Sequence, residues 1–313
     1  MSNITTTARR DVYSRITNKI IADLDRGVRT WMRPWSAEHA AGKIVRPLRH
    51  NGIPYKGINV IMLWSAATVK GYGCPLWLTF KQALDVGGNV RKGETGELVV
   101  YADRITRTET NNKGEEIERD IPFLKGYTVF NAEQCENLPA HFTTQVATPA
   151  LSPAQRIEIA DRFFAATRAD IRHGGTRAFY AQTPDYVQMP PFETFRDAES
   201  YAATLAHELT HWTKHDSRLA RDMGRKAWGD EGYAREELVA ELGSAFLCAD
   251  LGITPEVRED HAAYIATWLK VLKDDKRFVF SAASQAQRAV DFLHGLQPRV
   301  ADAPVADELG EAA

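Results

Sequence analysis

The segment that most constrains this chain is the pentapeptide His207-Glu208-Leu209-Thr210-His211. Two histidines four residues apart lie on the same face of an α-helix, where both imidazoles can reach one metal ion. The pentapeptide follows Asp197-Ala-Glu-Ser-Tyr, and apolar residues recur around it at helical spacing. The sequence therefore predicts a helix over about 197–214 that carries a metal-binding face.

Such a face indicates hydrolytic chemistry. A metal ion with an open coordination position lowers the pKa of its water to about 7, and a neighbouring carboxylate can then take the proton. Glu208 is the candidate for that role because it lies between the two histidines. We expect Zn²⁺ as the cofactor, with Mn²⁺ or another divalent metal as the alternative.

A third protein ligand is expected from the next predicted helix, at about 233–250, which contains Glu236-Glu237-Leu238-Val239-Ala240-Glu241. In zincin metallopeptidases with a glutamate ligand, which this pattern resembles, the upstream acid binds metal and an acid four residues later supports a histidine. That reading makes Glu237 the ligand and Glu241 its supporting residue. The reverse assignment, with Glu241 as the ligand, stays open.

Charge is distributed unevenly along the 313 residues, although the net charge is only -2. Residues 1–93 hold 15 Lys and Arg against 5 Asp and Glu, whereas residues 139–313 hold 19 against 26. The basic region predicts a polyanionic partner, with nucleic acid as the first choice. No apolar run approaches the ~20 residues that cross a bilayer, and the N-terminus lacks a secretory pattern, so we expect a cytoplasmic protein without membrane contact.

An uncharged segment with three prolines, at 138–153, predicts a linker between two domains. We therefore expect a single-stranded-DNA-binding domain over 1–138, a linker over 139–152, a metal-binding domain over 153–297 and a disordered tail over 298–313. Helices predicted at 12–24 and 58–70 and a hairpin of 97–104 with 123–130 make the first domain α+β. The second domain is expected to be mainly helical, with a small sheet at 177–180 and 186–189.

Aromatic and basic residues are interleaved in the N-terminal region, which holds four of the seven tryptophans. Bases stack on aromatic faces while basic side chains follow the phosphates, and this mixture predicts single-stranded DNA binding. Core packing is the alternative for the aromatic residues. The candidate DNA-binding residues are Trp31, Arg33, Trp35, Arg46, Arg49, Tyr55, Lys56, Lys81, Arg91 and Lys92.

Longer motifs resemble those of the ArdC-type antirestriction proteins of conjugative plasmids, which are related to TraC-type primases. The matching segments are Gly27-Val-Arg-Thr-Trp31-Met-Arg-Pro-Trp35, Pro47-Leu-Arg-His-Asn-Gly52-Ile-Pro-Tyr55-Lys-Gly-Ile-Asn59, Lys125-Gly-Tyr-Thr-Val-Phe-Asn131, Ala206-His-Glu-Leu-Thr-His-Trp212 and Tyr264-Ile-Ala-Thr-Trp-Leu269. The resemblance implies a single-stranded-DNA-binding domain, a zincin-like zinc metallopeptidase domain and protection of incoming DNA from host restriction. It makes a host restriction enzyme subunit a candidate protein target. The alternative is a protein that coats DNA and whose metal site is structural.

Overall fold

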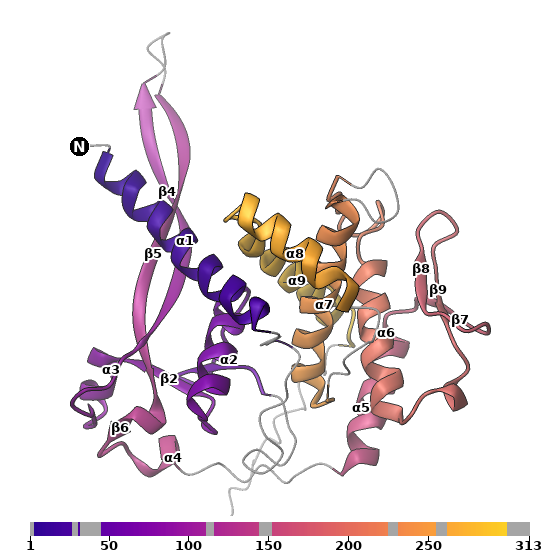
Figure 1. The fold of residues 1–313 in the computed structure, drawn as a ribbon, viewed down its shortest axis with the longest axis horizontal. Coiled ribbons are helices and arrows are strands. Elements are labelled where there is room, and N and C mark those ends of the chain that lie inside the picture. Colours follow the sequence, from indigo (N-terminus) through magenta and orange to yellow (C-terminus); the bar gives the residue numbers. More distant parts are fainter. Residues whose placement is uncertain are drawn as a thin grey trace, which may run out of the picture.

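The structure is a computed structural model that describes residues 3–26, 31, 45–110, 116–143, 152–224, 231–254 and 262–298. A long strand hairpin with two helices forms one end of the molecule, and a group of helices with a small sheet forms the other (Figure 1). The predicted α+β class is confirmed by these elements. Among the described residues, no helix is long and apolar enough to span a membrane.

The N-terminal region is built on a four-stranded sheet in the order β1-β2-β5-β4, in which β1 and β2 are parallel and the other pairs antiparallel. Helix α1 lies along the β4–β5 hairpin, and α2 packs against β4 (Figure 1). A second sheet pairs β3 with β6. The elements are α1 (Asn3–Asp25), β1 (Leu48–Arg49), α2 (Ile58–Lys70), β2 (Leu76–Thr79), α3 (Phe80–Asp85), β3 (Asn89–Val90), β4 (Glu97–Thr110), β5 (Glu116–Asn131), β6 (Cys135–Glu136) and α4 (Ala140–Thr143).

The C-terminal region is mainly helical, as predicted, and its three-stranded sheet has the order β7-β9-β8. Helix α7 contacts α6, α8 and α9, and it lies between α6 and the N-terminal region (Figure 1). The elements are α5 (Pro153–Ala166), β7 (Asp170–His173), β8 (Phe179–Ala181), β9 (Tyr186–Met189), α6 (Ala198–Trp212), α7 (Glu231–Leu251), α8 (Ala262–Asp274) and α9 (Phe278–Gly295).

Local sequence signals set several helix boundaries. Thr79 and Ser152 each form a complete capping box, in which the side chain accepts a backbone N–H that the first helical turn leaves unpaired. Helix α2 ends at Gly71, which has φ 74°, the left-handed conformation that glycine adopts without strain. Helix α2 spans the residues 58–70 that the sequence predicts, because its end depends on residues within one turn.

Other predictions differ from the structure or lie outside it. The hairpin is longer than predicted, and β7 was not predicted because its sequence, Asp-Ile-Arg-His, contains a single apolar residue. The predicted linker begins with the short helix α4, while residues 144–151 and 299–313 lie outside the described residues. The proposed division into domains over 1–138 and 153–297 stays a prediction.

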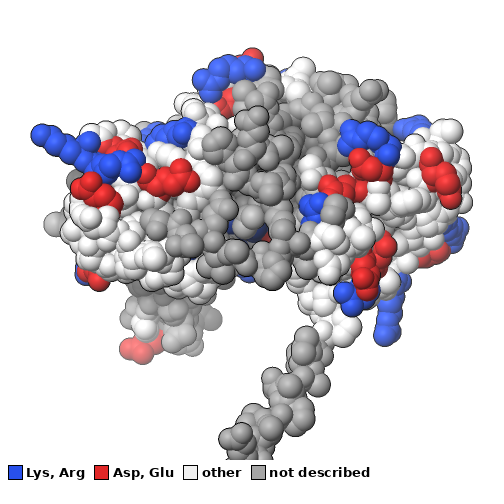
Figure 2. Space-filling view, turned by 90° about the horizontal axis from the view of Figure 1, so that it is seen from below, with Lys and Arg blue, Asp and Glu red and all other residues white. Residues whose placement is uncertain are grey.

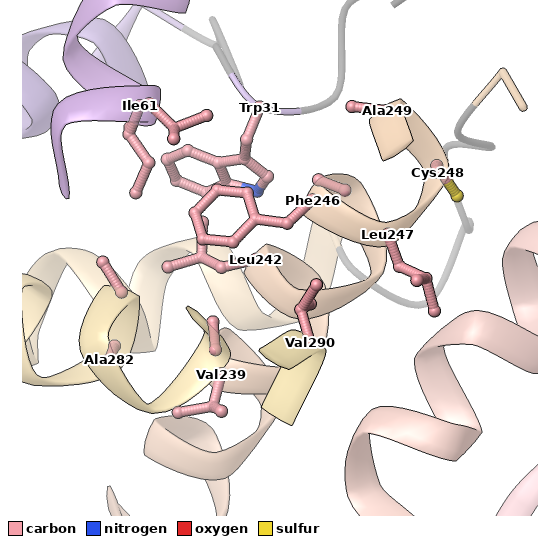
Figure 3. Close-up of a cluster of buried hydrophobic side chains, with 14 of the residues drawn as sticks. Trp31, Ile61, Val239, Leu242, Phe246, Leu247, Cys248, Ala249, Ala282 and Val290 are labelled. Atoms are coloured by element: carbon pink, nitrogen blue, oxygen red, sulfur yellow. The ribbon is translucent and has the colours of Figure 1, made fainter. Parts of the chain in front are cut away.

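One continuous apolar core joins the N-terminal and C-terminal regions. Trp31 and Ile61 contribute to it from the N-terminal region, and Leu242 and Phe246 contribute from α7 (Figure 3). The rings of Trp31 and Trp268 have centroids 6.4 Å apart, and those of Trp64 and Phe246 lie 5.9 Å apart. The apolar face of α7 is therefore covered by residues from the other end of the chain.

Candidate metal centre and nucleic-acid interface

The two histidines of the pentapeptide lie in the last two turns of α6. The helix begins after Asp197, whose carboxylate accepts the backbone N–H of Ser200 at 2.7 Å, and this cap satisfies a donor that the helix leaves unpaired. His207 and His211 are 3% and 6% exposed. Both imidazoles are thus held in the interior, on the same face of a capped helix.

Glu237 on α7 completes a three-residue cluster with these histidines. Potential ligand atoms of His207, His211 and Glu237 all lie within 4.8 Å of one another. His207 Nε2 lies 3.5 Å from Glu237 Oε2, and His211 Nε2 lies 3.4 Å from Glu237 Oε1. Both histidines therefore present the same nitrogen to one point between α6 and α7.

The position behind His211 is taken by Glu236, which the sequence analysis did not select. His211 Nδ1 lies 3.0 Å from Glu236 Oε1, whereas the sequence predicts Glu241 as the acid that supports a histidine. Glu241 is buried one turn further along α7, and among the described residues the three-ligand cluster contains Glu237 instead. The geometry favours Glu237 over Glu241 as the ligand.

Electrostatics in this cluster favour a cation. Burial lowers the pKa of His211, but the charge of Glu237 and hydrogen bonds to Glu236 and Glu237 outweigh it and raise the pKa to about 9. Burial raises the pKa of Glu236, yet hydrogen bonds from Arg221 and His211 lower it to about 2. His211 and His207 hold the pKa of Glu237 well below its usual range in spite of burial. Both carboxylates are therefore ionised near neutral pH.

The donor set fits a divalent metal ion. Two imidazole nitrogens and one carboxylate are a ligand set of catalytic zinc sites, and the same groups also bind Mn²⁺. Four carboxylates are buried here, and a cation stabilises such a concentration of negative charge; they belong to Glu208, Glu236, Glu237 and Glu241. A metal must displace protons from its ligands, and the carboxylate of Glu237 is already ionised.

Three of the ten candidate DNA-binding residues are buried, and the structure corrects their expected role. Trp31 is 2% exposed against Trp268, so its ring is not open to a base. Arg46 is 5% exposed and its guanidinium binds the carboxylate of Asp250 on α7. Tyr55 is buried under Arg49, and burial raises its pKa to about 12. All three stabilise the fold.

Five other candidates are exposed, namely Arg49, Lys56, Lys81, Arg91 and Lys92. They do not form a single group: Lys81, Arg91 and Lys92 lie on or next to the contacting elements α3 and β3, whereas Lys56 pairs with Asp291 on α9. Seen from below, basic and acidic side chains are interspersed at both ends of the molecule (Figure 2). Arg33 and Trp35 lie outside the described residues.

Exposed aromatic residues in the N-terminal region were not among the candidates. Phe80, Tyr101 and Tyr127 are 53%, 46% and 39% exposed. Tyr101 pairs across the hairpin with Lys125, whose Nζ lies 5.0 Å from the centre of the Tyr127 ring. The sequence signal for Tyr101 and Tyr127 was weak, because aromatic residues in a strand are as typical of a core as of a surface.

Two protein families match separate parts of the chain. Residues 10–130 match the N-terminal domain of the anti-restriction factor ArdC, and residues 158–285 match a zincin-like metallopeptidase family. The uncharacterized protein y4eC of Sinorhizobium fredii is 41% identical over 292 residues, which cover 92% of each chain. Two DNA primases TraC of Escherichia coli are each 35% identical over 300 residues, and the chain spans only 27% and 20% of their lengths.

The fold is also similar to two solved structures of the antirestriction protein ArdC from plasmid R388. The metal-free structure is 46% identical, with a TM-score of 0.76 over 91% of this chain and 97% of that one. The Mn(II)-bound structure has the same identity and coverage and a TM-score of 0.73. Sequence and structure thus agree over both regions of the chain.

Proposed function

Because this chain belongs to the ArdC family of antirestriction proteins, we propose that it protects incoming DNA from host restriction by combining single-stranded-DNA binding with a metallopeptidase centre. The observation that carries the proposal is the buried cluster of His207, His211 and Glu237. It lies within the residues that match a zincin-like metallopeptidase family. A host restriction enzyme subunit is the protein target to test first.

His207, His211 and Glu237 would hold the metal, and Glu208 would act as general base. Zn²⁺ is the first candidate from the ligand set, and the Mn(II)-bound relative supports Mn²⁺ as the second. A bound divalent ion would supply Lewis-acid activation of water and of a peptide carbonyl. Glu208 is buried in the same turn of α6 as His207, and in the proposed reaction it would accept a proton from the hydrolytic water.

For the N-terminal region we propose a surface that combines the exposed basic residues with exposed aromatic rings. Exposed basic side chains are suited to phosphate contacts, and those of Arg49, Lys81, Arg91 and Lys92 are exposed. Tyr127, beside Lys125, offers a ring face on which a base can stack. The relation to proteins named DNA primases supports a nucleic-acid partner.

The experiment that tests the catalytic part is the substitution Glu208→Gln in the full-length protein. It should abolish antirestriction in cells while single-stranded-DNA binding and metal content of the purified protein stay unchanged, because only the proton acceptor is lost. The control is Glu158→Gln, which changes an exposed glutamate on α5. Full protection by the Glu208→Gln variant would instead identify a DNA-coating protein whose metal site is structural.

The DNA-binding part is tested by Lys92→Ala and Tyr127→Ala in binding titrations with single-stranded DNA. Loss of one phosphate contact should lower the slope of log affinity against log salt by about 0.7 for Lys92→Ala. Loss of one stacked base should weaken binding by about 1–3 kcal/mol for Tyr127→Ala. Lys270→Ala on α8 is the control. An unchanged slope and an unchanged affinity would show that Lys92 and Tyr127 do not contact the bound single strand.

A further inference from the structure

Arg221 is a buried arginine in the segment between α6 and α7, and its side chain is 1% exposed. Its Nε donates a hydrogen bond to Glu236 Oε2 at 2.9 Å, and its Nη2 donates one to Glu236 Oε1 at 2.8 Å. This is the bidentate geometry in which the planar guanidinium matches a carboxylate. Arg221 therefore fixes both oxygens of Glu236.

The same guanidinium holds the end of α6. Nη2 donates to the backbone carbonyl of Thr210 at 2.9 Å, and Nη1 donates to Thr213 Oγ1 at 3.0 Å. The last carbonyls of a helix lack partners within the helix, so these bonds satisfy groups next to His211. Arg221 thus joins the last turn of the histidine helix to the first turns of the glutamate helix.

Glu236 in turn contacts His211, one of the proposed metal ligands. Its Oε1 accepts the Nδ1–H of His211 at 3.0 Å, which leaves Nε2 of the same ring to face Glu237 at 3.4 Å. A carboxylate behind a histidine ligand fixes the ring orientation and the tautomer. The chain of contacts therefore runs from Arg221 through Glu236 to the imidazole of His211.

Packing further along the two helices fixes their separation elsewhere. A Cβ atom at Gly243 would lie 2.5 Å from Thr210 Cγ2, and Ser244 Oγ donates to the carbonyl of Ala203 at 3.1 Å. These contacts leave α6 and α7 little freedom to slide. The contacts of Gly243 and Ser244 set the spacing of α6 and α7. Arg221 therefore affects the orientation of the His211 ring and not the distance between the helices.

From these contacts we infer that Arg221 is a positioning residue of the metal centre: through Glu236 it holds the His211 imidazole with Nε2 directed at the metal. The inference rests on the metal centre proposed above. Arginine suits the position because its bidentate contact and additional donors serve Glu236, Thr210 and Thr213 at once, which the single ammonium of lysine does not match.

The test measures Mn²⁺ affinity of the full-length protein by titration calorimetry. Arg221→Gln and Glu236→Gln should each weaken Mn²⁺ binding by about 10–100-fold, the usual effect of losing the partner of a ligating histidine. Arg221→Lys should lose less, because it keeps the charge near Glu236. Arg46→Gln is the control, since Arg46 makes a bidentate contact of the same kind with the more exposed Asp250 at the other end of α7. Its Mn²⁺ affinity should equal that of the wild type.

The outcomes separate this inference from the proposed function. If the wild-type protein binds neither Mn²⁺ nor Zn²⁺, the metal centre itself is refuted. If the wild type binds Mn²⁺ and the folded Arg221 and Glu236 variants bind it equally well, the positioning role is wrong. An equal loss in Arg46→Gln would show a general effect of stability and would also overturn the inference. Should Arg221→Gln fail to fold in circular dichroism, Arg221→Lys and Glu236→Gln decide.

Discussion

Two buried arginines bind carboxylates of α7, and the two pairs have the same chemistry but different neighbours. Near the start of the helix, Arg221 contacts Glu236, and at its end Arg46 contacts Asp250 through Nε and Nη2 at 2.7 Å and 2.8 Å. Glu236 also binds His211, whereas Asp250 also binds His294 on α9 at 3.1 Å. The first pair therefore ends at the metal centre and the second at the boundary between the two regions of the chain.

The difference shows that a buried ion pair takes its role from the groups around it. Arg46 also donates to Gln287 Oε1 at 2.8 Å and lies over the ring of Phe246 at 4.8 Å, so its surroundings are the shared core. Removing one partner of the Arg221–Glu236 pair leaves a buried charge and typically costs about 3–5 kcal/mol, and the cost should be smaller for the pair that includes the more exposed Asp250. Both pairs should thus matter for stability, but only the pair at Glu236 should matter for metal affinity.

The largest expected loss of stability comes from removing the N-terminal side of the shared core. A fragment of residues 153–297 would expose the face of α7 that carries Leu242 and Phe246, which Trp31 and Ile61 cover in the full chain (Figure 3). Because an exposed apolar face of this kind favours aggregation over folding, we expect the fragment to lack a cooperative unfolding transition in circular dichroism. The full-length protein is the control. A fragment that unfolds as cooperatively as the full chain would show that the regions are independent domains.

The next effect concerns one side chain of that core. Trp31→Ala should destabilise the protein by about 3–5 kcal/mol, because a buried tryptophan packed against Trp268 is lost. The measurement is urea unfolding, with Trp31→Phe as a control that keeps part of the packing. Single-stranded-DNA binding of the folded variant should be unchanged. Weakened DNA binding without loss of stability would show that Trp31 contacts DNA and is not a core residue.

Trp31 and Arg46 also show why the sequence assigned some buried residues to the DNA-binding surface. The metal-binding face of His207 and His211 depends on residues four positions apart, and the sequence predicted it correctly. Arg46 instead binds Asp250, 204 residues away, and nothing near it in the sequence distinguishes this contact from exposure to DNA. Burial that depends on distant partners cannot be inferred from local spacing.

The contacts of Arg221 were hidden for a related reason. Arg221 lies in a segment without helical periodicity, and its partner Glu236 stands beside the expected ligand Glu237, where the zincin pattern places no supporting acid. The pattern pointed to Glu241, four residues further along. Local spacing thus identified the residues that form the metal-binding face, and the fold was needed to identify the groups behind them.

A smaller loss of stability is expected from a substitution in the middle of α7, where Gly243 lies against Thr210 of α6. Gly243→Ala would place a Cβ atom 2.5 Å from Thr210 Cγ2, and Thr210 cannot move away easily because its Oγ1 donates to the carbonyl of Ala206. We expect a net destabilisation of about 1–2 kcal/mol, since overpacking outweighs the better helix propensity of alanine. Mn²⁺ affinity should also fall because α6 and α7 are forced apart.

The control for this substitution is Gly295→Ala at the end of α9, where a Cβ atom would meet nothing within 4 Å. This variant should be as stable as the wild type in urea unfolding and should bind Mn²⁺ equally well. If Gly243→Ala behaved in the same way, the close approach of the two helices would not be required for the metal centre, and the positioning role would rest on Arg221 alone.

The smallest expected change in stability comes from a substitution outside both ion pairs of α7, at Asp185 in the turn between β8 and β9. Arg218 Nη1 donates to Asp185 Oδ2 at 3.0 Å, and Tyr180 donates to Oδ1 at 2.8 Å. Hydrogen bonds from Arg218 lower the pKa of Asp185 below its usual range, against a smaller opposing effect of burial. Because the folded pKa lies below the unfolded value of about 3.9, this contribution to stability is complete above that pH and is lost as the pH falls through the folded pKa.

Asp185→Asn should therefore lower the free energy of unfolding near pH 7 by about 0.5–1 kcal/mol, a small value because the Asp185 side chain is 34% exposed and its charge is screened. Asparagine accepts the left-handed backbone at this position, φ 51°, so the backbone adds little strain. Urea unfolding at a series of pH values should show the difference from wild type shrinking below about pH 4. Asp216→Asn, at an exposed position, is the control. Mn²⁺ affinity should not change. Arg218 holds the end of α6 by donating a hydrogen bond to the carbonyl of Trp212 at 2.7 Å, and its described contacts do not include His207 or His211.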